Sequence, residues 1–371
     1  MNNLRFVHGG NVEEIKRKYK TEVIDFSANI NPLRSSALKA GFSQGYEGIF
    51  HYPDPQAKDL TGEIAKYWGV NEGNILVGNG STELIYLLVH TLMPKRVLIP
   101  APAFSEFERA AESVKAEVRF LALKEENGWT LELPILESAD ILFISNPNNP
   151  TGNLLLNNQN LEGLHSKLTV VDEAFMDFVP EEKKYTFIRK AIEDKGVAVL
   201  RSFTKFFSLA GLRVGYLIAH QDLIGRLKAA QPPWSVNAIA QSLAGIILND
   251  RDYIEETRKF IEKEREFLFN ELAKIPGLKP YPSVANFLLI KITNKEIDSR
   301  ILTERLIQAG LPGKGILIRD CGNFRGLNNK FIRVAILSHD ENMKLCQKIY
   351  VECNVSVTGE NNPLPPFIKE E

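Results

Sequence analysis

The sequence predicts an α/β fold, with a mainly parallel central sheet that carries helices on both faces and a smaller α+β domain. Between residues 75 and 220, apolar strand-like runs alternate with helix-like segments, which is the pattern of βαβ units. Several of these runs are continuously apolar, as expected for strands buried on both faces of a parallel sheet. After residue 285 the order becomes strand, helix, strand, strand and helix, which indicates a separate α+β layer.

The elements follow these patterns in chain order. Strands of the large domain are expected at 75–80, 96–100, 117–123, 140–145, 168–174, 197–203 and 214–220, with helices at 57–69, 81–93 and 104–116. A long amphipathic helix is expected at 250–275, where it links the two domains. The small domain is expected to hold strands at 285–292, 315–321 and 331–337, and helices at 298–310 and from near Ser338.

These elements divide the chain into four parts. Residues 1–35 are polar and irregular, and we expect them to form an N-terminal arm that joins the small domain. Residues 36–250 form the large domain, and residues 251–355 form the linking helix and the small domain. Residues 356–371 are polar and rich in proline, which predicts a loose tail.

Composition limits the classes of function. The 371 residues suffice for a large core, and 44% of them are hydrophobic and 25% charged, as in ordinary globular proteins. A net charge of −1 gives no reason to expect nucleic acid or a membrane as a partner. The three cysteines lack metal-ligand spacing and are odd in number, so we expect reduced thiols, no metal site and a cytoplasmic location.

The stretch RSFTKFFSLAGLRVGY, residues 201–216, carries the main chemical signal. Lys205 follows the apolar run 197–203, stands next to Thr204 and lies three residues after Ser202. A lysine at the end of a buried strand is suited to form an imine with a cofactor aldehyde, while the hydroxyl groups and Arg213 are suited to hold a phosphate. Taken alone, the same lysine would be read as a surface residue at a turn.

Two upstream stretches strengthen this interpretation. NPNNPTG follows the apolar strand at 140–145, and Asp172 ends the next apolar run. Carboxylates at the carboxyl ends of strands lie where ligands bind in open α/β sheets. An ionised aspartate paired with a pyridine nitrogen would keep that nitrogen protonated, and the ring would then act as an electron sink.

The stretch GNGSTE, residues 78–83, predicts a glycine-rich turn from a strand into a helix. Such a turn offers free backbone N–H groups and the positive end of a helix dipole to a phosphate. An ordinary capped helix would explain the same residues about equally well.

Taken in order, NNPTG, Asp172, Lys205 and Arg213 resemble the fold-type I superfamily of pyridoxal 5'-phosphate (PLP) enzymes, and the resemblance covers residues 1–353. It extends to the histidinol-phosphate aminotransferase branch and, within it, to the threonine-phosphate decarboxylases. The closer match rests on HGGN at 8–11, DFSANINPL at 25–33, DEAFMDF at 172–178 and the pair IRDC and FIRVAI within 318–336. Aminotransferases of this branch typically carry tyrosine where this chain has Phe175, a departure that weighs against an ordinary aminotransferase.

The resemblance implies a role for each matching residue. It makes Lys205 the residue that binds the cofactor aldehyde, Asp172 the partner of the pyridine nitrogen and Asn149 the partner of the ring oxygen. The cofactor phosphate is assigned to Ser81, Thr82, Ser202, Thr204, Arg213 and Tyr52 of a neighbouring subunit in a homodimer, and the ring is expected to stack on Phe104. Arg333 matches the arginine that receives the substrate α-carboxylate, with Asn149 close to the substrate as well. Arg319, His8 and Asn31 are candidates for the substrate phosphate, and Arg325 is an additional arginine whose role stays open.

The implied activity is decarboxylation of L-threonine O-3-phosphate to (R)-1-amino-2-propanol O-2-phosphate and CO2, which supplies the nucleotide-loop linker of cobalamin. Histidinol-phosphate transamination is the first alternative, because the same residues serve both reactions and only the orientation of the broken bond separates them. L-Serine O-phosphate is a close substrate variant, since one methyl group discriminates by only about 1–3 kcal/mol. A non-enzymatic protein of the same fold is a third alternative, which the presence of Lys205, Asp172 and Arg213 disfavours.

Overall fold

The computed structural model describes residues 8–135, 137–156, 161–308 and 314–354. The chain forms two compact units. The large unit contains residues 33–149 and 153–259, and the small unit contains residues up to 32, 150–152 and those from 260 onward. The division falls inside the long helix α9 (Arg251–Ala273) rather than at its start, and the expected tail at 356–371 lies outside the described residues. No helix in the described ranges is long and apolar enough to cross a membrane.

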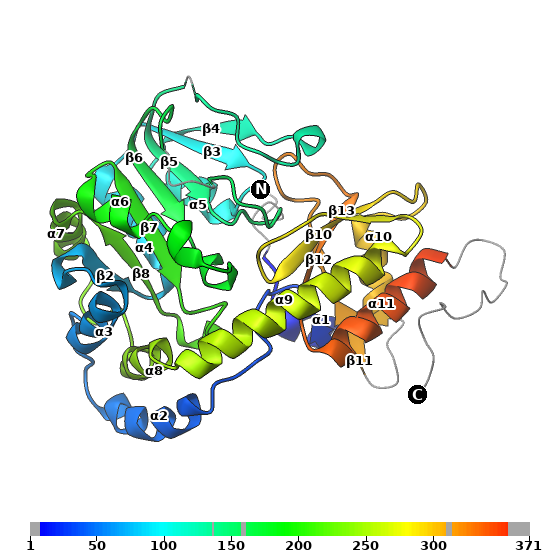
Figure 1. Ribbon diagram of the computed structural model, residues 1–371, viewed down its shortest axis with the longest axis horizontal. Coiled ribbons are helices and arrows are strands. Elements are labelled where there is room, and N and C mark those ends of the chain that lie inside the picture. The colour runs from blue at the N-terminus through cyan, green and yellow to red at the C-terminus, as the bar shows by residue number, and fades with distance from the viewer. Residues whose placement is uncertain (1–7, 136, 157–160, 309–313, 355–371) are drawn as a thin grey trace. The chain divides into compact units, whose positions relative to one another are not determined.

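The large unit is built on a seven-stranded sheet with the order β2-β8-β7-β6-β5-β3-β4 (Figure 1). Only β8 runs antiparallel to its neighbours, so the expected mainly parallel sheet is confirmed. The strands are β2 (Ile75–Gly78), β3 (Arg96–Ala101), β4 (Glu117–Ala122), β5 (Ala139–Ser145), β6 (Ser166–Asp172), β7 (Val197–Ser202) and β8 (Gly215–Ala219). Each lies within a few residues of its expected range because long apolar runs mark buried strands strongly.

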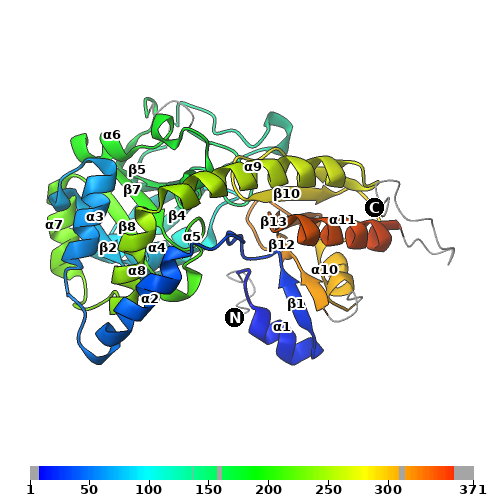
Figure 2. The ribbon, with the colours of Figure 1, turned by 60° about the horizontal axis from the view of Figure 1, so that its bottom comes forward.

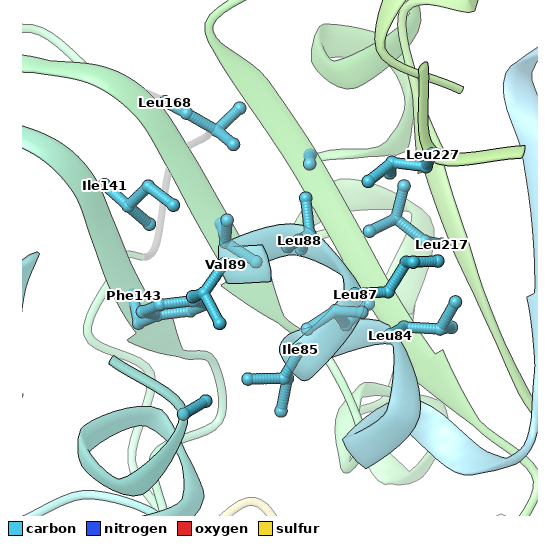
Figure 3. Packing of buried hydrophobic residues seen from close by; sticks show 14 of the residues in the cluster. Leu84, Ile85, Leu87, Leu88, Val89, Ile141, Phe143, Leu168, Leu217 and Leu227 are labelled. Atoms are coloured by element: carbon cyan, nitrogen blue, oxygen red, sulfur yellow. The ribbon is translucent and has the colours of Figure 1, made fainter. Parts of the chain in front are cut away.

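One face of this sheet is covered by α4, α5 and α7. Figure 3 shows apolar side chains of α4 packed against side chains of β5, β6 and β8, and the cluster continues onto α5 and α7. The helices of the large unit are α2 (Ala37–Tyr46), α3 (Lys58–Trp68), α4 (Gly80–Leu92), α5 (Ser105–Ser113), α6 (Ile188–Glu193), α7 (Gln221–Ala230) and α8 (Ala238–Leu248). Burial of this cluster fixes α4, whose first turn carries the sequence GST.

The small unit contains a four-stranded antiparallel sheet and a two-stranded parallel one. The first has the order β12-β13-β10-β9, with β9 (Leu278–Pro280), β10 (Phe287–Ile292), β12 (Arg319–Asp320) and β13 (Phe331–Ala335). The second pairs β1 (Glu22–Asp25) with β11 (Lys314–Leu317). The helices α1 (Val12–Tyr19), α10 (Ser299–Gln308) and α11 (His339–Asn354) complete the unit.

Two sequence-based expectations for this unit are wrong. Residues 12–25 are not irregular, since they form α1 and β1, the darkest blue elements of Figure 2. Strand β1 obtains its partner from β11, almost 300 residues later, so no local pattern announces it. The expected strand 315–321 is two short strands, β11 and β12, which belong to different sheets.

Candidate functional site

Asp172 ends β6 at the carboxyl edge of the large sheet, where the sequence placed it. Its carboxylate oxygen Oδ1 accepts the backbone N–H of Ala174 at 3.0 Å, and its backbone carbonyl accepts the N–H of Asn146 at 2.8 Å. The second bond ties the end of β6 to the first residue after β5. The strand edge therefore holds the Asp172 carboxyl in place with 7% of the residue exposed.

Burial decides the charge state of Asp172. Loss of solvent raises the pKa of this carboxyl to about 6, although the N–H of Ala174 acts in the opposite direction. A buried carboxylate with a raised pKa is stabilised by a cation brought next to it. The site therefore suits a ligand that presents a positively charged group, such as a protonated ring nitrogen.

A second group of residues forms a cradle at the first turn of α4, composed of Gly80, Ser81, Ser202, Arg213 and Gly215. Gly80 has a φ of 78°, and the guanidinium of Arg213 lies against its backbone, where a Cβ atom would stand. A Cβ atom on Gly215 would lie 2.8 Å from the Ser81 nitrogen, and Gly215 pairs with Ser202 between β7 and β8. Two glycines thus let a helix N-terminus, a hydroxyl group and a guanidinium approach one another.

This cradle has the chemistry of an anion site. The N–H groups of the first helical turn point outward and carry the positive end of the helix dipole. Thr82 follows in the same turn and is half-buried, while the backbone N–H of Thr204 donates to the Ser202 hydroxyl at 3.2 Å. Five of the residues expected at a phosphate are therefore brought together, namely Ser81, Thr82, Ser202, Thr204 and Arg213.

Lys205 lies in the turn that follows β7 and is half-buried. The ends of that turn are tied by a hydrogen bond from the Leu209 N–H to the Phe203 carbonyl at 3.2 Å. Because β6 and β7 pair with Asp172 opposite Leu200, the Lys205 turn leaves the same sheet edge as Asp172. The lysine is thereby placed beyond the end of the strand next to Asp172.

The loop at 146–149 is anchored to the sheet by its own asparagines. The amide oxygen of Asn146 accepts the N–H groups of Leu155 and Leu156 at 2.9 and 3.1 Å, and the amide of Asn148 donates to the Pro102 carbonyl at 3.0 Å. Asn149 follows in this loop and is half-buried.

Three aromatic residues singled out by the sequence occupy different surroundings. Phe104 precedes α5 and is half-buried, with its ring edge-on to that of Phe107 at 5.7 Å, while Phe175 is buried just beyond β6. Tyr52 is 82% exposed, and its ring lies 4.8 Å from that of Trp234. The expected contact between Tyr52 and a neighbouring subunit's phosphate stays a prediction.

Directly after Asp172 in the chain, Glu173 begins a set of buried charged residues that we call the Arg201 network: Arg201, Glu173, Asp177, Glu182 and Arg258. The Arg201 guanidinium reaches Glu173 at 2.9 Å, Asp177 at 3.1 Å and Glu182 at 3.2 Å, and Arg258 reaches Glu182 at 2.6 Å. Burial alone would lower the pKa of Arg201, but the three carboxylates raise it well above its ordinary value. The network thus holds three carboxylates against two guanidinium groups and locks the segment after β6 onto β7.

The small unit carries a different arrangement, the arginine pair Arg319 and Arg333. These residues stand directly opposite each other on β12 and β13, so both side chains share one face of the sheet. Arg333 donates to the Ser27 carbonyl at 2.9 Å, and the Asn29 amide, oriented with its oxygen toward the guanidinium, accepts from Nη1 and Nε at 3.2 and 3.1 Å. Arg319 donates to the Asn323 amide oxygen at 2.7 Å.

The electrostatics of this pair favour an added anion. Burial lowers the pKa of Arg333 to about 10, and the charge of Arg319 contributes to the lowering. Burial also lowers the pKa of Arg319. Two buried like charges that lie side by side on neighbouring strands repel each other. An anion bound between them would reduce this repulsion and replace the solvent that each guanidinium has lost.

The N-terminal motif reaches the arginine pair through Ser27. Gly9 lies against the Ser27 carbonyl, where a Cβ atom would overlap it, and the Gly10 N–H donates to the Ser27 hydroxyl at 2.8 Å. His8 therefore precedes two glycines that contact Ser27, whose carbonyl accepts a hydrogen bond from Arg333. The His8 side chain is exposed. Asn31 is buried, and Arg325 is exposed in the turn between β12 and β13.

Sequence reasoning missed two sets of residues here. Ser27 and Asn29 lie inside the noted motif DFSANINPL but received no individual role. Arg201 stands inside an otherwise apolar strand, and Glu173 and Asp177 stand in the run DEAFMDF. A charged residue in a continuously buried strand is the signal that could have revealed this network, since such a residue needs compensation.

The chain is similar to known proteins over most of its length. The model of the family described as aminotransferase class I and II matches residues 21–349. The chain is 36% identical to threonine-phosphate decarboxylase of Salmonella typhimurium, covering 91% of this chain and 94% of that one. It is 32% identical to histidinol-phosphate aminotransferase of Methanocaldococcus jannaschii, covering 91% of each chain. The crystal structure of L-threonine-O-3-phosphate decarboxylase from Porphyromonas gingivalis superimposes with a TM-score of 0.78 at 26% identity, covering 88% of this chain and 98% of that one.

Proposed function

Because the chain belongs to the aminotransferase class I and II family, we propose that it is a PLP-dependent decarboxylase. Its substrate is L-threonine O-3-phosphate, and its products are CO2 and (R)-1-amino-2-propanol O-2-phosphate, the linker of the cobalamin nucleotide loop. Relatives named threonine-phosphate decarboxylase, at 36% identity over nearly the whole chain, support this choice.

The observation that carries the proposal is the register that sets Arg319 opposite Arg333. A phosphoamino acid brings two anionic groups, an α-carboxylate and a phosphate, and the pair offers one guanidinium for each. Histidinol phosphate has no carboxylate, so it would use this pair less fully. In this assignment Arg333 holds the carboxylate in a bidentate fork, while Arg319, His8 and Asn31 hold the phosphate.

The residues of the large unit fit PLP. The glycine-lined cradle supplies the backbone N–H groups, hydroxyls and guanidinium that a phosphate needs, and Asp172 supplies the buried carboxylate for a protonated ring nitrogen. We assign the phosphate to Ser81, Thr82, Ser202, Thr204 and Arg213, the ring face to Phe104, the ring oxygen to Asn149 and the covalent link to Lys205. When bound, PLP accepts the electron pair that a broken bond at the substrate Cα releases.

The protein's own task is to choose which bond at Cα breaks and to handle one proton. Arg333 orients the carboxylate so that the bond from Cα to the carboxyl carbon breaks. CO2 leaves, and the electron pair of the broken bond stays behind at Cα. Lys205 would hold the cofactor aldehyde before the reaction, and its amine would donate a proton to Cα after CO2 has left. Phe175 lacks the hydroxyl group that tyrosine carries in aminotransferases of this branch. We therefore interpret phenylalanine at this position as a feature of the decarboxylating members.

A homodimer is part of this proposal, with Tyr52 of each subunit reaching the cofactor phosphate of the other. The large unit exposes further large apolar side chains, namely Phe42, Tyr46, Ile49, Phe50 and Trp234, with 47–64% of each exposed, and the Trp234 ring lies 4.8 Å from that of Tyr52. Contiguous exposed apolar residues mark interaction surfaces. Cytoplasmic location also belongs to the proposal, supported by an odd number of cysteines without metal-ligand spacing.

Product analysis with the purified, PLP-loaded protein tests the function. One reaction contains L-threonine O-3-phosphate, a second contains L-serine O-phosphate, and a third contains histidinol phosphate with 2-oxoglutarate. We expect CO2 and aminopropanol phosphate from the first reaction, at a higher rate than ethanolamine phosphate from the second. The Lys205→Ala variant, loaded in the same way, serves as the control and is expected to release no CO2.

The other outcomes each overturn part of the proposal. Faster formation of ethanolamine phosphate would move the substrate to L-serine O-phosphate and leave the reaction type intact. Glutamate from the third reaction, without CO2 from the first two, would make the protein a histidinol-phosphate aminotransferase with an unusual phenylalanine at position 175.

A further inference from the structure

We propose that the large unit carries a second ligand site, for a small organic anion with an apolar body, at the amino edge of its sheet. The site is a cavity of about 580 Å³, which we call the amino-edge cavity. It is lined by residues at the starts of β3, β5 and β6, the end of α4 and the first turns of α7. Asp172 and Ser202 end their strands at the opposite edge of the same sheet, so this cavity is separate from the proposed cofactor site. The inference does not rest on the proposed function.

The floor of the amino-edge cavity is apolar. Ile141 and Leu168 pair with each other on β5 and β6 and are 1% and 5% exposed, and Leu223 of α7 is 8% exposed. Figure 3 shows Ile141 and Leu168 beside each other at one end of the core cluster. These side chains belong to the core, so the floor is fixed by packing and needs no ligand to form. Its volume lies within the range of about 300–1,000 Å³ that is usual for small-molecule sites.

The rim of the cavity is positively charged. Lys95, Lys167, Lys195 and Arg226 contribute four cationic side chains, and Asp140 and Asp222 contribute two carboxylates. The difference is a surplus of two positive charges. A monovalent or divalent anion would neutralise this surplus.

Two of the four cations are already compensated. Asp140 Oδ2 accepts the backbone N–H groups of Lys95 and Arg96 at 2.8 and 3.0 Å, and Oδ1 pairs with the side chain of Lys167 at 2.8 Å. These contacts lower the pKa of Asp140 to about 2, with the Lys167 bond as the largest cause, so the carboxylate stays charged.

The second carboxylate, that of Asp222, also neutralises a lysine. Asp222 pairs with Lys195 at 2.6 Å and not with Arg226, one helical turn further on. Among the residues that the structure describes, neither Lys95 nor Arg226 forms an ion pair within 4 Å. Two available cations therefore stand at the mouth of a preformed apolar cavity.

This combination selects the ligand class. An apolar ring or chain fills the floor, and a phosphate, sulfonate or carboxylate attached to it meets Lys95 and Arg226. An uncharged apolar molecule would leave the surplus charge unneutralised, and a bare inorganic anion would leave the floor unfilled. The fitting molecule is amphipathic, with one anionic group at one end.

Fluorescent dyes test the site with the PLP-loaded enzyme. Anilinonaphthalene sulfonate has an aromatic body and one anionic group, and phenylnaphthylamine has the same aromatic body without the anion. We expect the sulfonate to bind at least tenfold more tightly than the uncharged dye, and high salt to reduce this difference because exposed charges are screened. Equal binding of the two dyes would overturn the proposal, as would absence of saturable sulfonate binding.

Charge-removing variants locate the dye. Lys95→Gln and Arg226→Gln are each expected to weaken sulfonate binding about two- to fivefold, and the double variant about tenfold, in line with single exposed charge contacts. Lys66→Gln and Arg251→Gln remove exposed charges elsewhere and serve as matched controls with unchanged binding. Unchanged binding in the double variant would place the dye elsewhere and overturn the proposal.

The assay also separates this site from the proposed catalytic function. Decarboxylation by the Lys95 and Arg226 variants, measured without dye, is expected to equal that of the wild type. If the wild type shows no decarboxylation, the proposed function fails while the dye result stands. If dye binding fails while CO2 is released, only the amino-edge cavity loses its assignment.

Discussion

The Arg201 network of the large unit and the arginine pair of the small unit both bury guanidinium groups, but their surroundings differ in charge. Arg201 contacts three carboxylates, which raise its pKa. The described acceptors of Arg333 include a backbone carbonyl and an amide oxygen; burial lowers its pKa to about 10, and the charge of Asp25 opposes this only in part. Burial of an arginine therefore does not by itself indicate function. Its acceptors separate a structural arginine from one suited to an external anion.

The comparison predicts opposite outcomes for the same substitution in the two places. Arg201→Met leaves Glu173, Asp177 and Glu182 buried with one guanidinium fewer, and we expect the free energy of unfolding to fall by about 3–5 kcal/mol. Urea denaturation of the PLP-loaded protein measures this loss. Arg258→Met is the matched control with a smaller loss, because its side chain is 28% exposed and Glu182 is its one carboxylate partner among the described residues. Reduced activity of Arg201→Met at unchanged stability would contradict the structural role.

At Arg333 the same change is expected to affect turnover. Arg333→Met removes the proposed carboxylate partner, and kcat/KM for L-threonine O-3-phosphate should fall about 100- to 1,000-fold. The melting temperature should stay the same or rise, because the buried charge is removed. Arg333→Lys keeps the charge but loses the fork, so it should restore only part of the activity. A destabilised Arg333→Met that retains its kcat/KM would make the two arginines alike and reject the comparison.

Arg319 sharpens the comparison within the pair, because the proposal gives it the phosphate. Arg319→Gln is expected to raise KM for L-threonine O-3-phosphate about tenfold, in line with loss of one charged contact. The slower reaction of unphosphorylated L-threonine should be unchanged in the same variant. An equal loss with both substrates would assign Arg319 to the carboxylate or to folding.

Asp172 extends the comparison to a buried carboxyl group. Burial raises its pKa to about 6, so the apoprotein takes up a proton there as the pH falls through that value. PLP needs the carboxylate form, and its affinity should be about tenfold lower at about pH 5 than at neutral pH. Between the ordinary aspartate pKa of about 4 and about 6, folded apoprotein binds more protons than the unfolded chain, so Asp172 makes the apoprotein more stable as the pH falls.

Titration of PLP into the apoprotein, followed by absorbance, measures the affinity at each pH. Asp172→Asn is the control, since it should bind PLP weakly with a flatter pH dependence. An identical pH dependence in wild type and Asp172→Asn would show that another group controls the affinity.

Much of this molecule could be predicted from its sequence, and the exceptions have physical causes. Most strands of the large sheet were predictable because they are largely apolar runs, although β4 alternates charged and apolar residues. The positions of Asp172 and Lys205 at the sheet edge were predictable because Asp172 ends one apolar run and Lys205 lies two residues after another. Strand β1 was not, because its partner β11 is remote in sequence.

Side-chain pairing was the harder part of the site. That Arg319 and Arg333 lie on neighbouring strands could be expected, but their direct opposition depends on register, which a short strand such as β12 leaves open. The carboxylate partners of Arg201 lie at 173–182, well before it in the chain, so no short motif reveals the pairing. The amino-edge cavity arises from the meeting of strand starts and helix ends, which only the fold brings together.

The most direct test of the proposed decarboxylation follows the atoms at Cα in deuterated water. With L-threonine O-3-phosphate and the PLP-loaded protein, the account predicts aminopropanol phosphate that retains the original Cα hydrogen and gains one solvent deuteron at that carbon. The carboxyl carbon should appear as CO2 in equal amount. Loss of the original Cα hydrogen with the carboxyl group still attached would mean that the other bond breaks, and would contradict the decarboxylase assignment.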